Sequence, residues 1–317
     1  MRTGGAVMTA RTWIDEAEAA LAGMERGEDA ARLGLQRDVS IGERTYIGVG
    51  GKAPLLLAPR DTEILARALA RLAAAGVGWE ALGAGSNLLV ADAGPSFVVV
   101  ATEHLDQEPA VDAGTVRVGA GTPVPRLVQR LQKAGLTGLE FAEGIPGSVG
   151  GAVRMNAGWH EGEFGTAVAS LETVTRTGTI ETLDAVPGTF AYRRSPGLGD
   201  RIVTSALLKL RPDDPARIGE RMRAYRDHRV RTQPVGERNA GCMFKNPAAD
   251  HAGRLIDTCG LKGRGVGRVM ISPIHANFFI NQGGATCRDV LALIDLVRDT
   301  VFRMSGVTLE SEVVTWM

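Results

Sequence analysis

Glycine is concentrated in short clusters between apolar segments, and these clusters limit the folds open to this chain. The 317 residues include 41 glycines, with dense clusters at 83–88 (GAGSNL) and 143–151 (EGIPGSVGG). Glycine at this density weakens a helix or a strand, so we expect ordered loops at both places. Loops without bulky side chains can direct several main-chain N–H groups at one anion. The clusters therefore suggest phosphate-binding loops.

The spacing of these glycines argues against the two commonest nucleotide-binding motifs. A Rossmann fingerprint has the pattern G-x-G-x-x-G. This chain has two G-x-G segments, at 83–85 and 119–121, but the position of the third glycine is occupied by Leu88 in the first and by Val124 in the second. No cluster is followed by the lysine of a P-loop. The sequence also lacks HExxH, CxxC and Asp-rich calcium motifs, so we expect no metal site.

Charge and hydropathy exclude several classes of partner. Lys and Arg total 36, as do Asp and Glu, so no overall field attracts nucleic acid or an acidic membrane. No apolar run approaches the roughly 20 residues that span a bilayer, and residues 1–24 carry acids where a secretion signal needs an apolar core. The three cysteines form no even disulfide framework. We expect a cytoplasmic protein, a monomer or weak homo-oligomer, with no nucleic-acid or membrane partner.

Apolar periodicity predicts alternating strands and helices along the chain. Strands are predicted at 55–58, 77–82, 97–101 and 202–210, and hairpins at 111–118 and 171–183. Helices are predicted from Asp61 to Gly76, from Thr122 and Pro123 to Gly135, from Ala216, and over 254–259 and 288–304. A final strand over 307–316 would place Glu310 and Glu312 in one environment. The polar run 211–215 is the predicted domain border.

The order of the motifs resembles that of a known family. The motifs are, in order, 45–51 (TYIGVGG), 82–89 (LGAGSNLL), 144–151 (GIPGSVGG) with 156–158 (NAG), 192–193 (YR), 240–247 (AGCMFKNP), 255–257 (LID), 261–263 (LKG) and 309–313 (LESEV). Together they are similar to the UDP-N-acetylenolpyruvoylglucosamine reductases, which act in peptidoglycan precursor synthesis. The resemblance covers nearly everything after about Asp38.

The resemblance implies an α+β fold in three parts. Residues 1–37 would form a leader helix. Residues 38–212 would form a vanillyl-alcohol-oxidase-type (PCMH) FAD-binding domain of two α+β subdomains, at about 38–104 and 105–212. Residues 213–317 would form an α+β substrate-binding domain whose last strand returns a catalytic glutamate to the flavin site. The interval from Leu210 to Pro234 is too short for the tyrosine-bearing substrate loop of the longer family form, so we expect the shorter form.

The resemblance also implies an activity. The family reduces the enolpyruvyl ether of a UDP sugar to a lactyl ether, with non-covalent FAD as cofactor and NADPH as reductant. Hydride addition leaves negative charge beside the substrate carboxylate, so the site needs a cationic or hydrogen-bonding group and a proton donor. The matching positions are Arg193 and Glu312, which would polarise the carboxylate, and Cys242, which would donate the proton. Most relatives carry serine at the position of Cys242, and a thiol is the stronger acid.

The resemblance further assigns residues to cofactor and substrate. The FAD-binding positions are Tyr46, Gly83, Gly85, Ser86, Asn87, Leu88, Gly144, Ile145, Pro146, Gly147, Ser148, Gly151, Asn156 and Gly158. The substrate-binding positions are Tyr192, Lys245, Asn246, Lys262, Arg264, His275 and Asn277. In the arginine-rich run from Arg217 to Arg231 we expect mostly a solvated helix face, with one or two residues near Arg229 contacting a diphosphate.

Other interpretations stay open. Without the family pattern, Arg193 and Glu312 are ordinary surface charges, and Cys242 is a small buried apolar residue. Another flavin oxidoreductase of this fold, such as a hydroxy-acid or alcohol oxidase, would share the FAD loops. A non-catalytic sugar-nucleotide-binding protein could share the fold as well.

Overall fold

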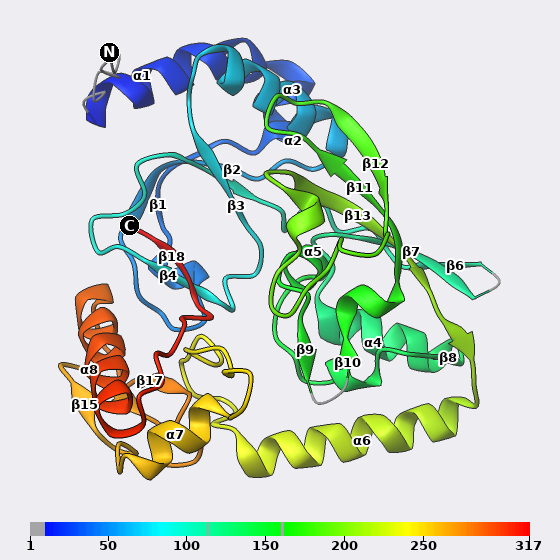
Figure 1. The fold of residues 1–317 in the computed structure, drawn as a ribbon. Helices are drawn as coiled ribbons and strands as arrows, with labels where there is room; N and C mark the ends of the chain where they lie inside the picture. Colours follow the sequence, from blue (N-terminus) through cyan, green and yellow to red (C-terminus); the bar gives the residue numbers. More distant parts are fainter. Residues whose placement is uncertain (1–9, 113, 160–161) are drawn as a thin grey trace.

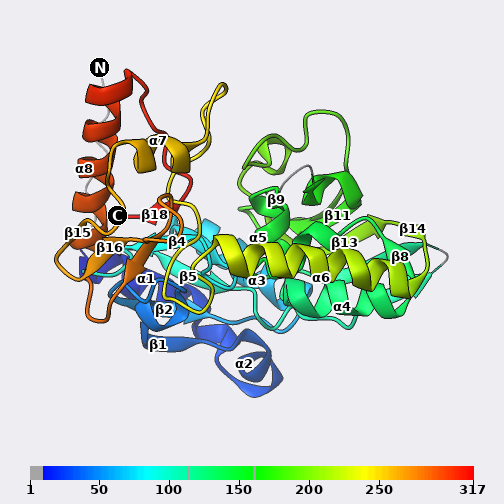
Figure 2. The same cartoon turned by 90° about the horizontal axis from the view of Figure 1, so that it is seen from below.

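Three regions follow one another along the chain in the computed structural model, which describes residues 10–112, 114–159 and 162–317 (Figure 1). Each region contains a sheet, and the third begins with a long helix that runs along the base of the molecule in Figure 1 and across its front in Figure 2. Among the described residues no helix combines the length and apolar character needed to cross a bilayer. The prediction of an α+β fold is confirmed.

The first region is a four-stranded sheet covered by helices. Its strand order is β1-β2-β5-β3, and its elements are α1 (Ala10–Leu21), α2 (Gly27–Leu33), β1 (Gln36–Ser40), β2 (Lys52–Leu57), α3 (Thr62–Ala74), β3 (Trp79–Leu82) and β5 (Val98–Ala101). Helix α3 begins where the Asp61 carboxylate accepts a hydrogen bond from the Ile64 N–H, 2.9 Å away. Its buried face, which includes Leu65 and Leu69, packs with α1 over the sheet. The predicted leader is therefore two helices, and residues 1–9 lie outside the described residues.

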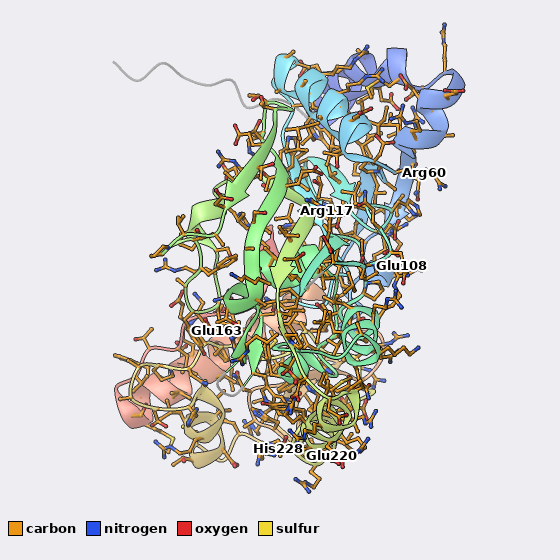
Figure 3. All side chains as sticks on the ribbon, turned by 90° about the vertical axis from the view of Figure 1, so that its right-hand side faces the viewer. Arg60, Glu108, Arg117, Glu163, Glu220 and His228 are labelled. Carbon is orange, nitrogen blue, oxygen red and sulfur yellow. The ribbon has the colours of Figure 1, made fainter. Side chains whose placement is uncertain are left out.

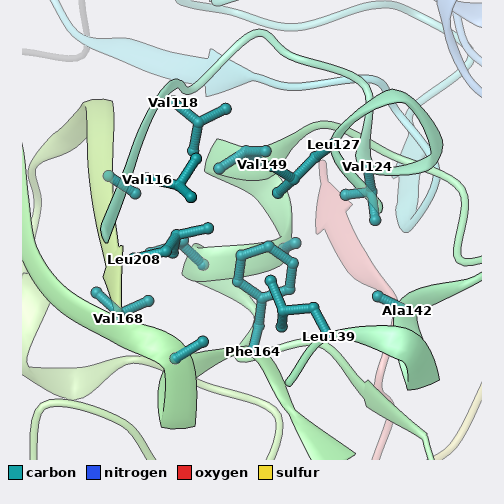
Figure 4. Close-up of a cluster of buried hydrophobic side chains, with 14 of the residues drawn as sticks. Val116, Val118, Val124, Leu127, Leu139, Ala142, Val149, Phe164, Val168 and Leu208 are labelled. Atoms are coloured by element: carbon teal, nitrogen blue, oxygen red, sulfur yellow. The ribbon is translucent and has the colours of Figure 1, made fainter. Parts of the chain in front are cut away.

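The second region is a five-stranded antiparallel sheet in the order β12-β11-β13-β7-β6. Its elements are β6 (Ala110–Asp112), β7 (Thr115–Gly119), α4 (Val124–Lys133), β8 (Leu136–Thr137), α5 (Val149–Arg154), β9 (Gly158–Trp159), β10 (Gly162–Glu163), β11 (Val168–Val174), β12 (Ile180–Asp184), β13 (Ile202–Lys209) and β14 (Arg211–Pro212). Its core contains Phe164 together with Val116 and Val118 of β7 and Val124 and Leu127 of α4 (Figure 4). Pro123 precedes α4 as predicted, but Thr122 does not cap it, because its hydroxyl donates to Asp106 instead.

The third region begins with α6 (Pro215–Thr232), close to the predicted border. It continues through α7 (Ala252–Thr258), β15 (Gly265–Val266), β16 (Val269–Ile271), β17 (Phe279–Asn281) and α8 (Cys287–Ser305). Helix α8 starts with a capping box in which Thr286 and Asp289 satisfy each other's main-chain N–H groups. The interval from Leu210 to Pro234, which the sequence showed to be too short for the substrate loop of the longer family form, consists mostly of helix α6.

The end of the chain returns to the first region. Strand β18 (Val314–Trp316) pairs in parallel with β4 (Leu88–Val90), which directly follows the first glycine cluster. The predicted strand over 307–316 is too long, because residues 307–313 form only a single bridge, from Ser311 to Phe244. The prediction that Glu310 and Glu312 share one environment is also wrong. The Glu310 side chain is 74% exposed, whereas that of Glu312 is 16% exposed.

Candidate functional site

The first glycine loop folds closely against neighbouring main chain. Gly85 has a φ of +67°, and a Cβ there would lie 2.1 Å from the Arg44 carbonyl oxygen. No other residue type fits that position without moving the main chain. The Gly85 carbonyl accepts a hydrogen bond from the Tyr46 N–H, while the Tyr46 side chain stays half exposed. The loop is thus held in one conformation by its own backbone.

This loop leaves donors available for a ligand. The main-chain N–H groups of Ala84, Gly85, Ser86 and Asn87 form no main-chain hydrogen bond within the described part of the chain. Such a row of N–H groups is suited to a phosphate. Leu88 follows as the first residue of β4, where its side chain is buried in the core.

The second glycine loop lies directly beside the first. A Cβ on Gly83 would lie 2.9 Å from the Ser148 hydroxyl oxygen, and one on Gly147 would lie 3.1 Å from that of Ser86. Ser148 caps α5 by accepting a hydrogen bond from the Gly151 N–H. The two loops that were predicted to hold a diphosphate are therefore in contact.

The rest of the second loop fixes its approach to α4. Gly144 and Gly147 both have positive φ, at +76° and +132°. Ile145 packs against the core of the second region, and the Gly147 carbonyl accepts from the Val124 N–H at the start of α4. Pro146, which has no N–H to donate, lies between these two fixed points.

The side-chain amide of Asn156 is fully hydrogen-bonded within the protein. Its amide donates to Glu163 Oε2 (2.8 Å) and to the Ala191 carbonyl (3.0 Å), and its oxygen accepts from the Gly165 N–H (2.8 Å). These bonds tie together the segments that flank Arg193, on the side of the molecule where Glu163 is labelled in Figure 3. The structure thus gives the Asn156 side chain an internal role, and the cofactor contact of this residue stays a prediction.

Arg193 and Glu312 form a partly buried ion pair between regions. Arg193 Nε lies 3.0 Å from Glu312 Oε1, and the two side chains are 19% and 16% exposed. Arg193 has a φ of +55° in a two-residue turn closed by Ala191 and Arg194, a conformation that costs a non-glycine residue free energy. Its guanidinium also donates to the Gly158 carbonyl at 2.9 Å. Gly158 is necessary here because a Cβ would lie 2.5 Å from the Gly162 carbonyl oxygen and 3.2 Å from the guanidinium.

Glu312 is placed by the glycine loop itself. The Asn87 amide donates to the Glu312 carbonyl oxygen at 3.2 Å, two residues before β18 begins. Burial raises the pKa of the Glu312 carboxyl, while the nearby Arg193 and Lys245 charges lower it. Burial therefore brings this carboxyl closer to protonation than an exposed glutamate.

Cys242 lies in the same cluster. The pKa of its thiol is raised to about 12, mainly by burial and also by the Glu312 charge, although Arg193, Arg229 and a hydrogen bond with Asn277 oppose the change. The thiol is therefore protonated at neutral pH. Cys259 and Cys287, also free, have thiol pKa values raised by burial but lie on or beside α7 and α8. The predicted catalytic residues Arg193, Cys242 and Glu312 are thus brought together.

Three predicted substrate residues border this cluster. The Tyr192 hydroxyl accepts a weak hydrogen bond (3.4 Å) from the Asn246 N–H, and the Tyr192 ring lies under the Arg193 guanidinium, 4.8 Å from its carbon. Lys245 forms an ion pair with the exposed carboxylate of Glu310. Tyr192 and Asn246 therefore connect the second region to the third across the site.

The other predicted substrate residues have different surroundings. Asn277 is buried, and its amide both accepts from and donates to the main chain of Phe244, so it holds the segment that follows Cys242. Lys262 forms an ion pair with Asp257 at 2.8 Å. The pKa of His275 is lowered mainly by burial and, to a smaller extent, by the Lys262 charge. Arg264 is exposed in the turn after Lys262. The structure does not bring Lys262, Arg264 or His275 into contact with the catalytic cluster.

Sequence reasoning missed Trp159 and Glu143 at the edge of the cluster, and it expected one or two residues near Arg229 to contact a diphosphate. The Arg229 guanidinium on α6 lies 4.7 Å above the Trp159 ring, and Glu143 is buried at the start of the second glycine loop. Glu143 pairs with Arg226 at 3.5 Å. The spacing of Arg226 and Arg229 on one helix could have indicated that both face the same loop. Trp159 left no signal beyond its place after the NAG motif.

Two surface hollows lie elsewhere. One, of about 610 Å³, is bordered by Thr137, Glu140 and Tyr225, and the other, of about 370 Å³, by Asp92 and Cys287. Neither hollow is lined by Arg193, Cys242 or Glu312. The described residues contain no group of three or more His, Cys, Asp or Glu placed to hold a metal ion.

Comparison with known proteins gives two matching family models. Residues 53–184 match the FAD binding domain, and residues 233–316 match the C-terminal domain of UDP-N-acetylenolpyruvoylglucosamine reductase. The first model covers both glycine loops and the second covers Cys242 and Glu312. A flavin fits the observed loops, because their free N–H groups and close-packed glycines are suited to a diphosphate.

Curated relatives and a solved structure agree with these models. A UDP-N-acetylenolpyruvoylglucosamine reductase from Anaeromyxobacter sp. (strain Fw109-5) is 44% identical over 90% of this chain and 90% of its own length. One from Geobacter metallireducens is 41% identical over 94% of this chain and 97% of its own. The crystal structure of UDP-N-acetylenolpyruvylglucosamine reductase from Thermus caldophilus superposes with a TM-score of 0.77 and 39% identity, covering 90% of this chain and 100% of that one.

Proposed function

Because the chain belongs to the UDP-N-acetylenolpyruvoylglucosamine reductase family, we propose that it reduces the enolpyruvyl ether of a UDP sugar to UDP-N-acetylmuramate with electrons from NADPH. The chain is an FAD-dependent oxidoreductase of peptidoglycan precursor synthesis. The observation that supports the proposal most directly is the Arg193–Glu312 ion pair beside the Cys242 thiol. This cluster is joined to the FAD loop by the Asn87–Glu312 hydrogen bond.

When bound at the glycine loops, FAD would supply the hydride-transfer chemistry that links NADPH to the enolpyruvyl double bond. The protein's contribution is to hold the reacting groups and to manage charge and protons. We assign the diphosphate to the free N–H groups of Ala84 to Asn87 and to the loop around Ser148. Tyr46, next to Gly85, would cover one side of this loop.

The Arg193–Glu312 pair would orient the substrate carboxylate and stabilise negative charge on the carbon beside it. The guanidinium is held by Gly158, Tyr192 and Glu312, so little reorganisation is needed when charge develops. Glu312, whose pKa is raised, can donate a hydrogen bond to an enol-like oxygen once protonated. Asn156 would act by fixing the turn that carries Arg193.

Cys242 would donate the proton that completes the reduction. Its thiol is neutral at physiological pH and therefore carries the proton that a carbanion or enol carbon requires. The thiolate that remains would lie near the Arg193 and Arg229 guanidinium groups, which favour it. Uptake of a proton from water would restore the thiol.

The remaining assignments complete the proposal. Tyr192 and Asn246, which join the second and third regions, would contact the sugar nucleotide together with the neighbouring Lys245. We place the FAD-binding domain at 38–212 and the substrate-binding domain at 213–317, with α6 as their connection. We also propose a cytoplasmic protein that acts as a monomer or weak homo-oligomer.

The experiment follows flavin absorbance in the purified protein. Bound FAD should bleach with NADPH under anaerobic conditions and recover when UDP-N-acetylenolpyruvoylglucosamine is added. Recovery with oxygen or a hydroxy acid, but not with the UDP sugar, would favour an oxidase of the same fold. Absence of flavin and of NADPH oxidation would favour a non-catalytic binding protein.

A further inference from the structure

Arg229 is a partly buried cation that the proposed reaction does not yet use as a ligand-binding group. It lies on α6, with its guanidinium 4.7 Å above the Trp159 ring. A Cβ on Gly144 would lie 3.0 Å from the Arg229 Cδ, so the glycine loop makes room for this side chain. Arg229 is therefore packed between the second glycine loop and an aromatic ring.

The Arg229 guanidinium lacks the partners that usually accompany a buried charge. Its Nε atom is buried and has no hydrogen-bond partner among the described residues. No carboxylate of those residues forms an ion pair with it, and the neighbouring Glu143 pairs with Arg226 instead. Stacking on Trp159 occupies one face of the guanidinium but leaves its N–H edge available. A buried donor without a partner is costly unless a ligand satisfies it.

Charge balance in the catalytic cluster points to the same need. Glu312 neutralises Arg193 at 3.0 Å, and Glu310 neutralises Lys245. These pairs offer no net positive charge to an anionic substrate. Arg229 stacks on Trp159, which directly follows Gly158, and the Gly158 carbonyl accepts a hydrogen bond from Arg193. The Arg229 guanidinium therefore lies at the edge of the catalytic cluster, and it is still cationic at neutral pH. It thus supplies the positive charge that Arg193 and Lys245 do not.

We infer that Arg229 binds, together with the Arg193–Glu312 pair that orients it, the carboxylate shared by the enolpyruvyl substrate and the lactyl product, and so selects carboxylated sugar nucleotides over those without this group. The inference rests on the proposed function. The carboxylate is attached to the carbon that takes its proton from Cys242, whereas the diphosphate lies a sugar ring away from that carbon. A guanidinium at the edge of the cluster that contains Cys242 therefore meets the carboxylate first, and two parallel N–H···O bonds would hold it.

The test compares two ligands on the FAD-bound protein. UDP-N-acetylmuramate carries the carboxylate, and UDP-N-acetylglucosamine carries the same diphosphate without it. Dissociation constants are measured by calorimetry for wild type, Arg229→Met, Arg229→Lys and Arg223→Met. Arg223 is exposed on the same helix and serves as the matched control. Flavin content is recorded for each variant, and Arg229→Lys provides the comparison should Arg229→Met not retain FAD.

The expected result is a loss specific to the carboxylate. Arg229→Met should bind UDP-N-acetylmuramate about 10- to 100-fold more weakly, as expected when a hydrogen bond to a charged group is removed. Its affinity for UDP-N-acetylglucosamine should equal that of wild type, and Arg229→Lys should fall between them. Unchanged binding of both ligands, or an equal loss for both, would overturn the inference, the latter by assigning Arg229 to the diphosphate. Wild-type protein that binds neither nucleotide would overturn the proposed function itself.

Discussion

Replacing Arg229 with methionine should stabilise the protein although it weakens ligand binding. Burial lowers the pKa of the Arg229 guanidinium from 12.5 to about 10. Since a tenfold change in an acid constant corresponds to about 1.4 kcal/mol, keeping this cation in the folded state costs about 3 kcal/mol. The contact with Trp159 returns about 0.5–2 kcal/mol, part of which methionine retains by packing on the ring. The net gain for Arg229→Met is about 1–2 kcal/mol.

The pH dependence of this gain follows from the direction of the change. A base whose folded pKa is lowered is destabilising wherever it is charged, so the cost is full below about pH 10. It is lost as the pH rises from about 10 toward 12.5. The advantage of Arg229→Met should therefore be the same at pH 7 and at pH 9.

Urea unfolding of the FAD-bound protein, followed by circular dichroism, provides the measurement. Midpoints are compared between variants, because a chain with several cores need not unfold in one step. Arg223→Met should stay within about 0.5 kcal/mol of wild type, as exposed substitutions usually do. A lower midpoint for Arg229→Met than for this control would show that Arg229 supports the fold, and the reasoning from burial would be wrong.

Three further results are expected. Cys242→Ala should keep NADPH reduction of the flavin nearly intact but greatly slow reoxidation by the UDP sugar in stopped-flow absorbance, while Cys242→Ser should retain turnover; normal reoxidation in Cys242→Ala would exclude the proton-donor role. Burial raises the pKa of the Cys242 thiol to about 12, so its alkylation by iodoacetamide should be slow at pH 7. The alkylation rate, measured by mass spectrometry, should rise about tenfold per pH unit up to pH 10. Rapid alkylation at pH 7 would mean that the thiolate is already formed. Gly85→Ala should be purified without FAD, since its Cβ would lie 2.1 Å from the Arg44 carbonyl oxygen. The control is Gly236→Ala, at a glycine that also has a positive φ (+87°) but has no atom within 4 Å of the added Cβ. This control should lose only about 1–2 kcal/mol of stability and keep the flavin.

Local signals in the sequence predicted the elements that depend on local structure. The final helix, predicted over 288–304, is α8 at Cys287–Ser305, because apolar spacing and an N-terminal cap define it without help from the rest of the chain. The segment 307–313 alternates like a strand but has few partners, because pairing depends on which other segments fold beside it. Periodicity alone could not show that this segment mainly connects α8 of the third region to β18, which pairs with β4.

The catalytic trio could be predicted from motif order, but the use of individual side chains could not. Asn156 belongs to a motif near the FAD loops, yet its amide is directed at the turn that carries Arg193. Arg229 is one of six arginines on α6 and became distinctive only through its burial against Trp159, a residue some 70 positions earlier in the chain. Such assignments depend on where side chains from distant segments meet.

The pairing of β18 with β4 also affects how the protein is made. Asn87 and Glu312, which lie on the two sides of this junction, are separated by 225 residues. A ribosome must synthesise 225 residues beyond Asn87 before the FAD loop can gain this neighbour, and contacts over such sequence distances form slowly. Incomplete chains could form the sheet of the first region but would lack Glu312. The complete site is therefore formed late in biosynthesis, which keeps unfinished chains from acquiring reductase chemistry.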